Sequence, residues 1–298
     1  VLPAIALALL PWARLLRVSA VLCLLPLFGA RDAVPAGALE ITVFDVGKAT
    51  AVLLETRTHS LLYGTGDSFG SKGGPMEQII LPRLRARHVA RLDVLILDRV
   101  DRDTAAGLLA IDAAMPPMLR LAAGQNDTRV LPPQLTACQA GQAWEWDGVR
   151  FEFLYPPAEL RGEPATRACV LQVKGPGGSL LLPGDVSLGV EHELLARGLG
   201  RIDVLLVPRH GAAAASSTAF LQALAPRFAL ASLSRNARDA DSTGKVMARY
   251  RDAGSRWFDT ATHGALLLQL RAGFPPTVAS QRSRRIGIWS RPAADPQR

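Results

Sequence analysis

Residues 92–107 read LDVLILDRVDRDTAAG, and residues 202–217 read IDVLLVPRHGAAAASS. In each stretch a short, almost wholly apolar run leads directly into a loop that carries ionisable side chains. A short apolar run of this kind predicts a buried strand, and polar residues placed on loops at strand ends are typical of functional sites. The two passages therefore predict a sheet protein whose site lies where its strands end.

Apolar runs and helical patterns alternate through the rest of the chain. Runs at 39–46, 50–56 and 59–64 predict a β-meander. Further strands are expected at 143–146, 149–155, 169–174, 179–182, 227–233 and 263–270, and helices at 75–89 (interrupted by Pro82), 105–114, 191–197, 217–225 and 243–254. This order predicts an α/β protein, in which two sheets form a sandwich flanked by helices.

The first 30 residues have the composition of a membrane segment. Two apolar runs flank Arg14 and Arg17, which predicts the end of one membrane helix, a basic turn and a second, short span at residues 15–30. An interfacial helix, or an apolar helix packed on the following domain, remains open. If the span crosses, the positive-inside bias places both arginines in the cytoplasm and the following domain on the other side. We assign residues 1–37 to this segment and its linker, and residues 38–271 to the sandwich.

The bulk composition excludes a disordered chain, and the charge is unevenly placed. Of 298 residues, 49% are hydrophobic, and the formal net charge is +8. From residue 271 onward six arginines stand against one aspartate, an excess of five positive charges. Residues 272–298 are therefore expected to form a basic, disordered tail, with Arg282, Arg284 and Arg285 as candidate contacts to DNA phosphates or anionic lipid; a solvated end is the alternative.

The three cysteines show no zinc-ligand spacing. Cys23 lies in the apolar segment, and Cys138 and Cys169 lie in the expected sandwich. An oxidising compartment would permit a Cys138–Cys169 disulfide, whereas two reduced core thiols are the alternative. The sequence leaves both open, because it does not give the distance between the two residues.

Ordered short motifs give the chain a resemblance to the metallo-β-lactamase superfamily, and more narrowly to the C-terminal domain of the ComEC family of DNA-uptake channels. The family's Asp-Val-Gly-Gln-Gly resembles DVGKAT, which keeps Asp45 and Gly47 but has Lys48 for the Gln. Its Asp-Thr-Gly resembles GTG, so Gly64 replaces the acid. The resemblance implies an αββα sandwich preceded by a membrane segment.

The central motif of the family, Ser-His-x-Asp-x-Asp-His, resembles DRVDRDT, which keeps Asp101 and Asp103 but has Arg99 and Thr104 at the two histidine positions. Later motifs of the family are kept in part. Thr-Gly-Asp resembles PGD with Asp185, which the resemblance implies as the bridge between two metals. Pro-His-His-Gly-Ser resembles PRHGA, which keeps His210 and has Arg209 for the first His, and a later His-Pro element has no match in RDADSTGKV.

The substitutions predict that no metal cofactor is held. A permanently charged guanidinium repels a metal ion, so Arg99 and Arg209 are expected to pair instead with Asp101, Asp103 and Asp185. The alternative is a site of Asp101, Asp103, Asp185 and His210 for one divalent metal, Mg²⁺ or Mn²⁺ rather than Zn²⁺. A third possibility is that these aspartates only cap helices or end loops, as Asp103 could do at the start of the expected helix.

The resemblance implies the C-terminal portion of a bacterial inner-membrane channel protein that takes up DNA for natural transformation, with the sandwich in the periplasm. Expected partners are single- or double-stranded DNA, the inner membrane and other competence components. The family domain is hydrolase-like, but the lost ligands predict that this one lacks hydrolase activity. The alternatives are a metal-dependent phosphodiesterase or nuclease that degrades the strand left outside, and a non-functional relic of a competence gene.

Overall fold

The computed structural model describes residues 34–66, 73–98, 102–123, 135–158, 168–234 and 240–284. The expected membrane span at 15–30, with Arg14, Arg17 and Cys23, lies outside these ranges. Within them, no helix is long and apolar enough to cross a membrane. The compact unit that carries the described residues begins at Val34, close to the expected start of the sandwich.

Two mixed sheets form the centre of this unit. Sheet A has the order β15-β14-β1-β2-β3-β4-β5-β6, and sheet B has the order β13-β12-β11-β10-β9-β8-β7. The strands of sheet A are β1 (Leu39–Val43), β2 (Val52–Glu55), β3 (Ser60–Tyr63), β4 (Val94–Leu97), β5 (Leu119–Ala122), β6 (Thr136–Ala137), β14 (Leu266–Leu270) and β15 (Thr277–Ser280). Those of sheet B are β7 (Ala143–Trp146), β8 (Val149–Tyr155), β9 (Val170–Gly175), β10 (Gly178–Leu182), β11 (Val204–Leu206), β12 (Phe228–Ala231) and β13 (Arg256–Asp259).

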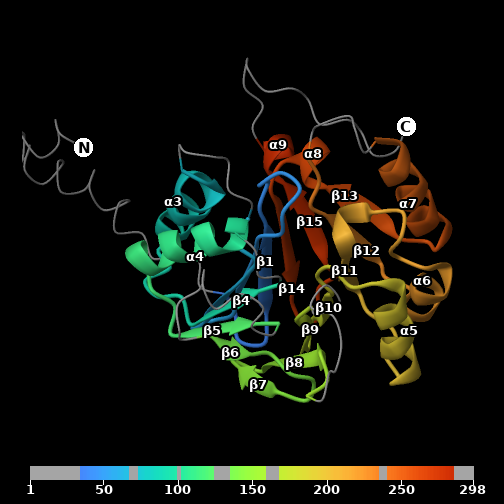
Figure 1. The fold of residues 1–298 in the computed structure, drawn as a ribbon, viewed down its shortest axis with the longest axis horizontal. Helices are drawn as coiled ribbons and strands as arrows, with labels where there is room; N and C mark the ends of the chain where they lie inside the picture. The colour runs from blue at the N-terminus through green and yellow to red at the C-terminus, as the bar shows by residue number, and fades with distance from the viewer. Residues whose placement is uncertain are drawn as a thin grey trace, which may run out of the picture. The chain divides into compact units, whose positions relative to one another are not determined.

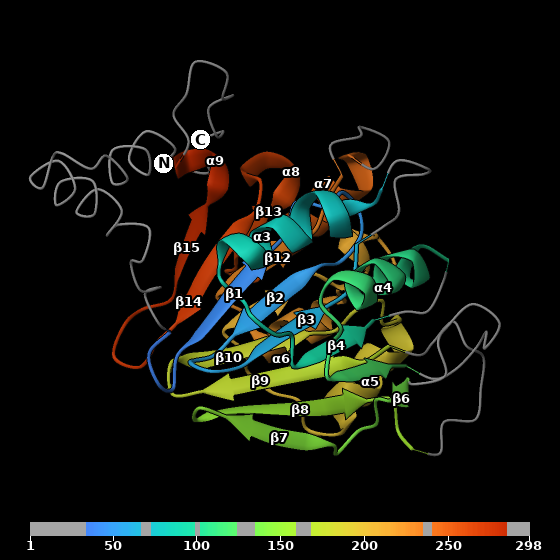
Figure 2. The ribbon, with the colours of Figure 1, turned by 90° about the vertical axis from the view of Figure 1, so that its left-hand side faces the viewer.

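Helices cover the outer face of each sheet, which gives four layers (Figures 1 and 2). Sheet A carries η3 (Met76–Ile80), α3 (Leu81–Ala86) and α4 (Arg102–Ala114); sheet B carries α5 (Leu188–Ala196), α6 (Thr218–Leu224) and α7 (Ala240–Asp252). The short elements η5 (Pro208–Gly211), α8 (Thr260–His263) and α9 (Gln281–Arg284) follow β11, β13 and β15. The expected αββα sandwich is confirmed.

Three apolar clusters hold the layers together. The inner cluster joins the facing sides of the sheets and includes Tyr63, Phe151 and Phe228. A second packs sheet B against its helices, and a third packs sheet A against η3, α3 and α4. Both faces of the central strands are therefore buried, and this explains why the sequences of these strands are continuous apolar runs.

The longer strands and helices of the sequence prediction are confirmed, and four short strands were missed. The interruption at Pro82 is also confirmed: the helix changes there from a π-type turn to α3, and Pro82 lies at the start of α3. The missed strands β5, β6, β13 and β15 have two to four residues each. Their pairing to neighbouring strands, rather than an apolar pattern, defines them.

The expected boundary at residue 271 was wrong. Residues 277–280 form β15, which pairs with β14 from Leu266↔Ser280 to Gln269↔Thr277. Helix α9 then extends to Arg284. The sandwich therefore continues through residue 284, because backbone pairing at the edge of sheet A orders a segment whose polar composition suggested a tail.

Candidate functional site

Two residues retained from the family motifs, Asp185 and His210, lie together where β10 and β11 end. The His210 Nε2 atom is 3.6 Å from the Asp185 Oδ1 atom. The backbone N–H of Arg209 donates to the Gly184 carbonyl at 3.2 Å, which ties the two loops together. Gly184 has a φ of +62°, and a Cβ on it would lie 2.8 Å from the Tyr63 hydroxyl. Glycine is thus required at this turn both by conformation and by space.

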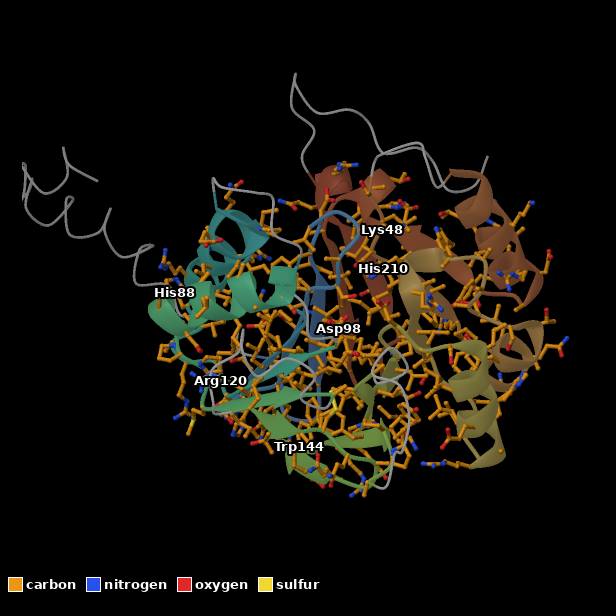
Figure 3. The ribbon with its side chains drawn as sticks, viewed as in Figure 1. Lys48, His88, Asp98, Arg120, Trp144 and His210 are labelled. Atoms are coloured by element: carbon orange, nitrogen blue, oxygen red, sulfur yellow. A yellow bond between two sulfur atoms is a disulfide. The ribbon has the colours of Figure 1, made fainter. Side chains whose placement is uncertain are left out.

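Asp98 and Tyr63 complete the described part of the site, and sequence reasoning did not select them. Asp98 directly follows β4 and is 5% exposed, and its Cβ lies 3.5 Å from the position of a Cβ on Gly184 (Figure 3). Burial raises the pKa of Tyr63 well above its ordinary value, and the Asp98 and Asp185 carboxylates add to the rise. Tyr63 therefore stays neutral, and its hydroxyl donates to the Cys169 carbonyl at 2.8 Å. An acid placed directly after the run LDVLIL was the available signal for Asp98.

The backbone around Gly64 leaves no room for the acid that the family motif carries there. Gly64 has a φ of +77°, and a Cβ on it would lie 2.2 Å from the Thr50 carbonyl oxygen. The Gly64 N–H donates to the Ile96 carbonyl at 2.8 Å, and the Gly66 N–H donates to the Thr50 carbonyl at 3.1 Å. These hydrogen bonds on both sides hold Gly64 against Thr50, so a side chain at this position requires the loop to move.

The structure describes only some of the other positions from the family motifs. Thr104 lies in the first turn of α4 and is 3% exposed. Arg209 is exposed and makes no ion pair with Asp185, so that part of the expected ion pairing was wrong; the left-handed backbone at Arg209 and His210 turns His210 toward Asp185. Arg99 and Asp101 lie outside the described residues, and of Asp103 only its position in the first turn of α4 is described.

Arg282, one of the candidate DNA contacts, binds the body of the sandwich. Its guanidinium donates to the carbonyls of Ala261 and Thr262 and lies 3.1 Å from Asp45, the acid of the first motif. These contacts hold the side chain against the fold, and its role as a DNA contact stays a prediction. Of the other two candidates, Arg284 is described only as the last residue of α9, and Arg285 lies outside the described residues.

Three positions of the family's metal-site motifs carry residues other than the usual ligands. Gly64 supplies no acid, Thr104 supplies no imidazole, and Arg209 supplies a cation. Among the residues that the structure describes, no group of three or more histidines, cysteines or acids is arranged to hold an ion.

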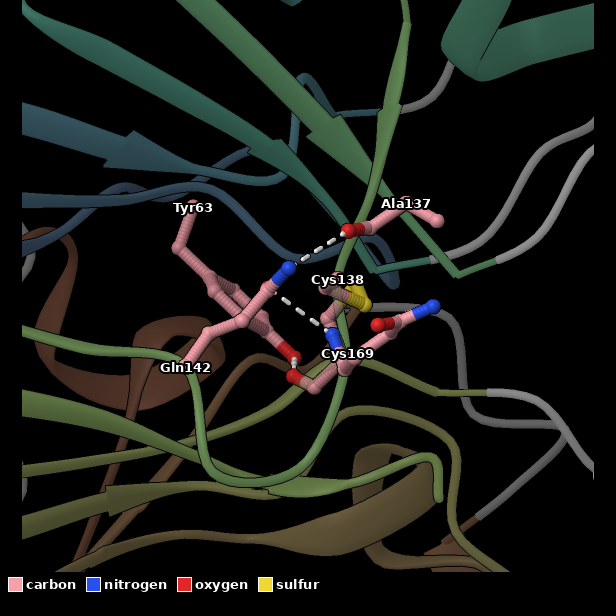
Figure 4. The surroundings of a disulfide bond; sticks show 6 residues. Tyr63, Ala137, Cys138, Gln142 and Cys169 are labelled. Carbon is pink, nitrogen blue, oxygen red and sulfur yellow. Dashed lines mark hydrogen bonds between the residues drawn. A yellow bond between two sulfur atoms is a disulfide. The ribbon is translucent and has the colours of Figure 1, made fainter. Parts of the chain in front are cut away.

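A disulfide joins Cys138 to Cys169 and closes the sandwich beside this site. The two Cα atoms are 5.9 Å apart, so the pairing left open by the sequence is confirmed. Figure 4 shows Tyr63 reaching the Cys169 carbonyl and Gln142 bracing the segment around Cys138. The Gln142 amide accepts from the Gln139 N–H at 2.9 Å and donates to the Ala137 carbonyl at 3.3 Å.

Comparison with known proteins gives long sequence matches. The chain is 34% identical over 281 residues to competence protein ComA of Neisseria gonorrhoeae, covering 93% of this chain and 39% of ComA. It is 32% identical over 197 residues to recombination protein 2 of Haemophilus influenzae, covering 66% of this chain and 24% of that protein. It is 29% identical over 253 residues to the uncharacterised protein YcaI of Escherichia coli, covering 84% of this chain and 32% of YcaI. The chain thus spans well under half the length of each relative.

No protein-family model matches the chain. Among solved structures, CmlA, a diiron β-hydroxylase from Streptomyces venezuelae, aligns with a TM-score of 0.53 and 13% identity over 78% of this chain and 54% of CmlA. At this identity the likeness shows the fold alone.

Proposed function

Because the chain belongs to the ComEC family of competence proteins, as its match to ComA over 93% of its length shows, we propose that it is part of a membrane protein that takes up DNA during transformation. Its sandwich supports uptake without hydrolysing DNA. The observation that carries the second statement is the backbone at Gly64, where a Cβ would lie 2.2 Å from the Thr50 carbonyl oxygen. With Arg209 at a ligand position, the domain keeps the fold of a hydrolase and lacks its metal-holding set.

Loss of the metal set is tested by metal content. The full chain, purified without chelator, is expected to contain no stoichiometric zinc or manganese, because Arg99, Thr104 and Arg209 stand where the family motifs have histidine ligands. Elemental analysis measures this directly. One equivalent or more of tightly bound metal per chain would contradict the proposal.

The neighbouring Asp185 and His210 also favour a second candidate, a phosphodiesterase that uses one hard ion held with Asp101 and Asp103. This candidate requires cleavage of labelled DNA in Mg²⁺ or Mn²⁺ that Asp185→Asn abolishes. The non-hydrolytic proposal requires no cleavage by either chain.

The uptake role is tested in cells. Deletion of the gene that encodes this chain is expected to abolish natural transformation, because the imported strand then lacks its route through the inner membrane. The intact gene supplied in trans is expected to restore transformation, which controls for effects on neighbouring genes. Normal transformation in the deleted strain would instead identify the chain as a relic.

We further propose that the sandwich lies in the periplasm. The Cys138–Cys169 disulfide supports this location, because structural disulfides form and persist in oxidising compartments and are rare in the reduced cytoplasm. The partners are then DNA, the inner membrane and the other components of the uptake machinery.

A further inference from the structure

A polar groove of about 400 Å³ lies on the outer face of sheet B, at the opposite end of β11 from His210. Strands β8 and β9 line one side, and the segment 197–201 that follows α5 lines the other. Lys174, Arg197 and Arg201 line it together with one acid, Glu152. The groove is therefore positively charged on balance.

The floor of the groove carries the side-chain amide of Gln172. Gln172 lines the groove and is only 6% exposed, yet its side chain makes no hydrogen bond with any residue that the structure describes. A primary amide has two donors and an acceptor, and the amide atoms of Gln172 are not among the fully buried side-chain atoms that lack a partner, so they are open to the groove. An amide in this position is suited to a polar ligand that enters the groove.

The cations around Gln172 are arranged for an anion. Lys174 and Arg201 are exposed and form no ion pair within the described ranges, whereas Arg197 pairs with Glu193. Lys174 also lies directly opposite Arg150 on the neighbouring strand. Arg150 itself pairs with Glu152, the acid of the groove, at 3.2 Å, so this acid does not neutralise Lys174.

We propose that this groove binds the phosphodiester backbone of single-stranded DNA, with Lys174 and Arg201 on the phosphates and the Gln172 amide as a hydrogen-bond donor. The proposal rests on the uptake function and adds to it a binding site separate from the former metal site. A concave groove with its amide at the floor suits a strand better than a flat lipid surface, which cannot reach Gln172. The test must therefore distinguish binding to DNA from binding to anionic lipid.

The test is binding of a fluorescent oligothymidine to the full chain in detergent, measured by anisotropy at several salt concentrations. Lys174→Ala with Arg201→Ala is expected to weaken binding about tenfold and to flatten the slope of log affinity against log salt by about 1.4, or about 0.7 for each lost phosphate contact. Gln172→Leu, which keeps the volume, is expected to weaken binding several-fold and leave the slope unchanged.

The matched control is Lys245→Ala with Arg251→Ala, which removes the same charge from exposed positions on α7, next to the far edge of sheet B. This control is expected to keep wild-type affinity and slope. Equal losses of DNA affinity in both double variants, or no loss in either, would overturn the proposed binding site. Loss of binding to phosphatidylglycerol vesicles with unchanged binding to DNA would also overturn it. None of these results bears on the transformation test, so the two proposals fail separately.

Discussion

Replacing Gly64 with Asp, the acid of the family motif, is expected to lower the free energy of unfolding by about 4 kcal/mol rather than to rebuild a metal site. The added Cβ would lie 2.2 Å from the Thr50 carbonyl oxygen, at a φ of +77°. Backbone strain and overpacking therefore act together. Urea unfolding of the variant, followed by tryptophan fluorescence, measures the loss.

Gly254→Ala separates the two causes. Gly254 has a φ of +81°, and a Cβ there would meet no atom within 4 Å, so its replacement carries the backbone strain alone, about 1–2 kcal/mol. Gly64→Ala is expected to cost clearly more than Gly254→Ala. Equal costs for the two alanine variants would show that the loop around Gly64 adapts to a side chain. Stoichiometric zinc in a chain that combines Gly64→Asp with Arg99→His, Thr104→His and Arg209→His would show that restoring the ligands restores the metal site.

Removal of the disulfide is expected to lower the free energy of unfolding by about 3–4 kcal/mol, because the bridge closes a loop between residues 31 apart in sequence. Cys138→Ala with Cys169→Ala, or reduction of the native chain, is expected to give the same loss in urea unfolding. Reductant is expected to leave the double variant unchanged. Cys23→Ala is the control, since Cys23 takes no part in the bridge.

Thiol labelling of the same two cysteines tests the proposed compartment. When the chain is denatured before labelling, chain exported to the periplasm is expected to show no free thiol at Cys138 and Cys169, which are buried in the fold, whereas chain retained in the cytoplasm is expected to react at both with a maleimide. Free thiols at both positions in natively located chain would contradict the periplasmic proposal.

The sequence determined the layers and the location of the site. Long apolar runs such as LDVLIL and IDVLLV can be buried only as central strands, and the polar residues that follow them must meet at the strand ends. Asp185 and His210 were named from the resemblance to the family's motifs, and they do lie together. The short strands were not predictable, because two to four residues contain too little pattern to distinguish a strand from a loop.

Contacts between residues distant in the chain were decided only by the tertiary structure. The sequence showed that Gly64 lacks an acid, but only the fold places Thr50 where the missing side chain would stand. It showed a basic segment after residue 271, but only strand pairing orders β15 and brings Arg282 to Asp45. The position of Gln172 on the floor of a groove is likewise visible only in the fold, where residues of β8, β9 and the end of α5 line the same groove. Composition and periodicity report which face of an element is buried, whereas a contact depends on the path of the whole chain between its two partners.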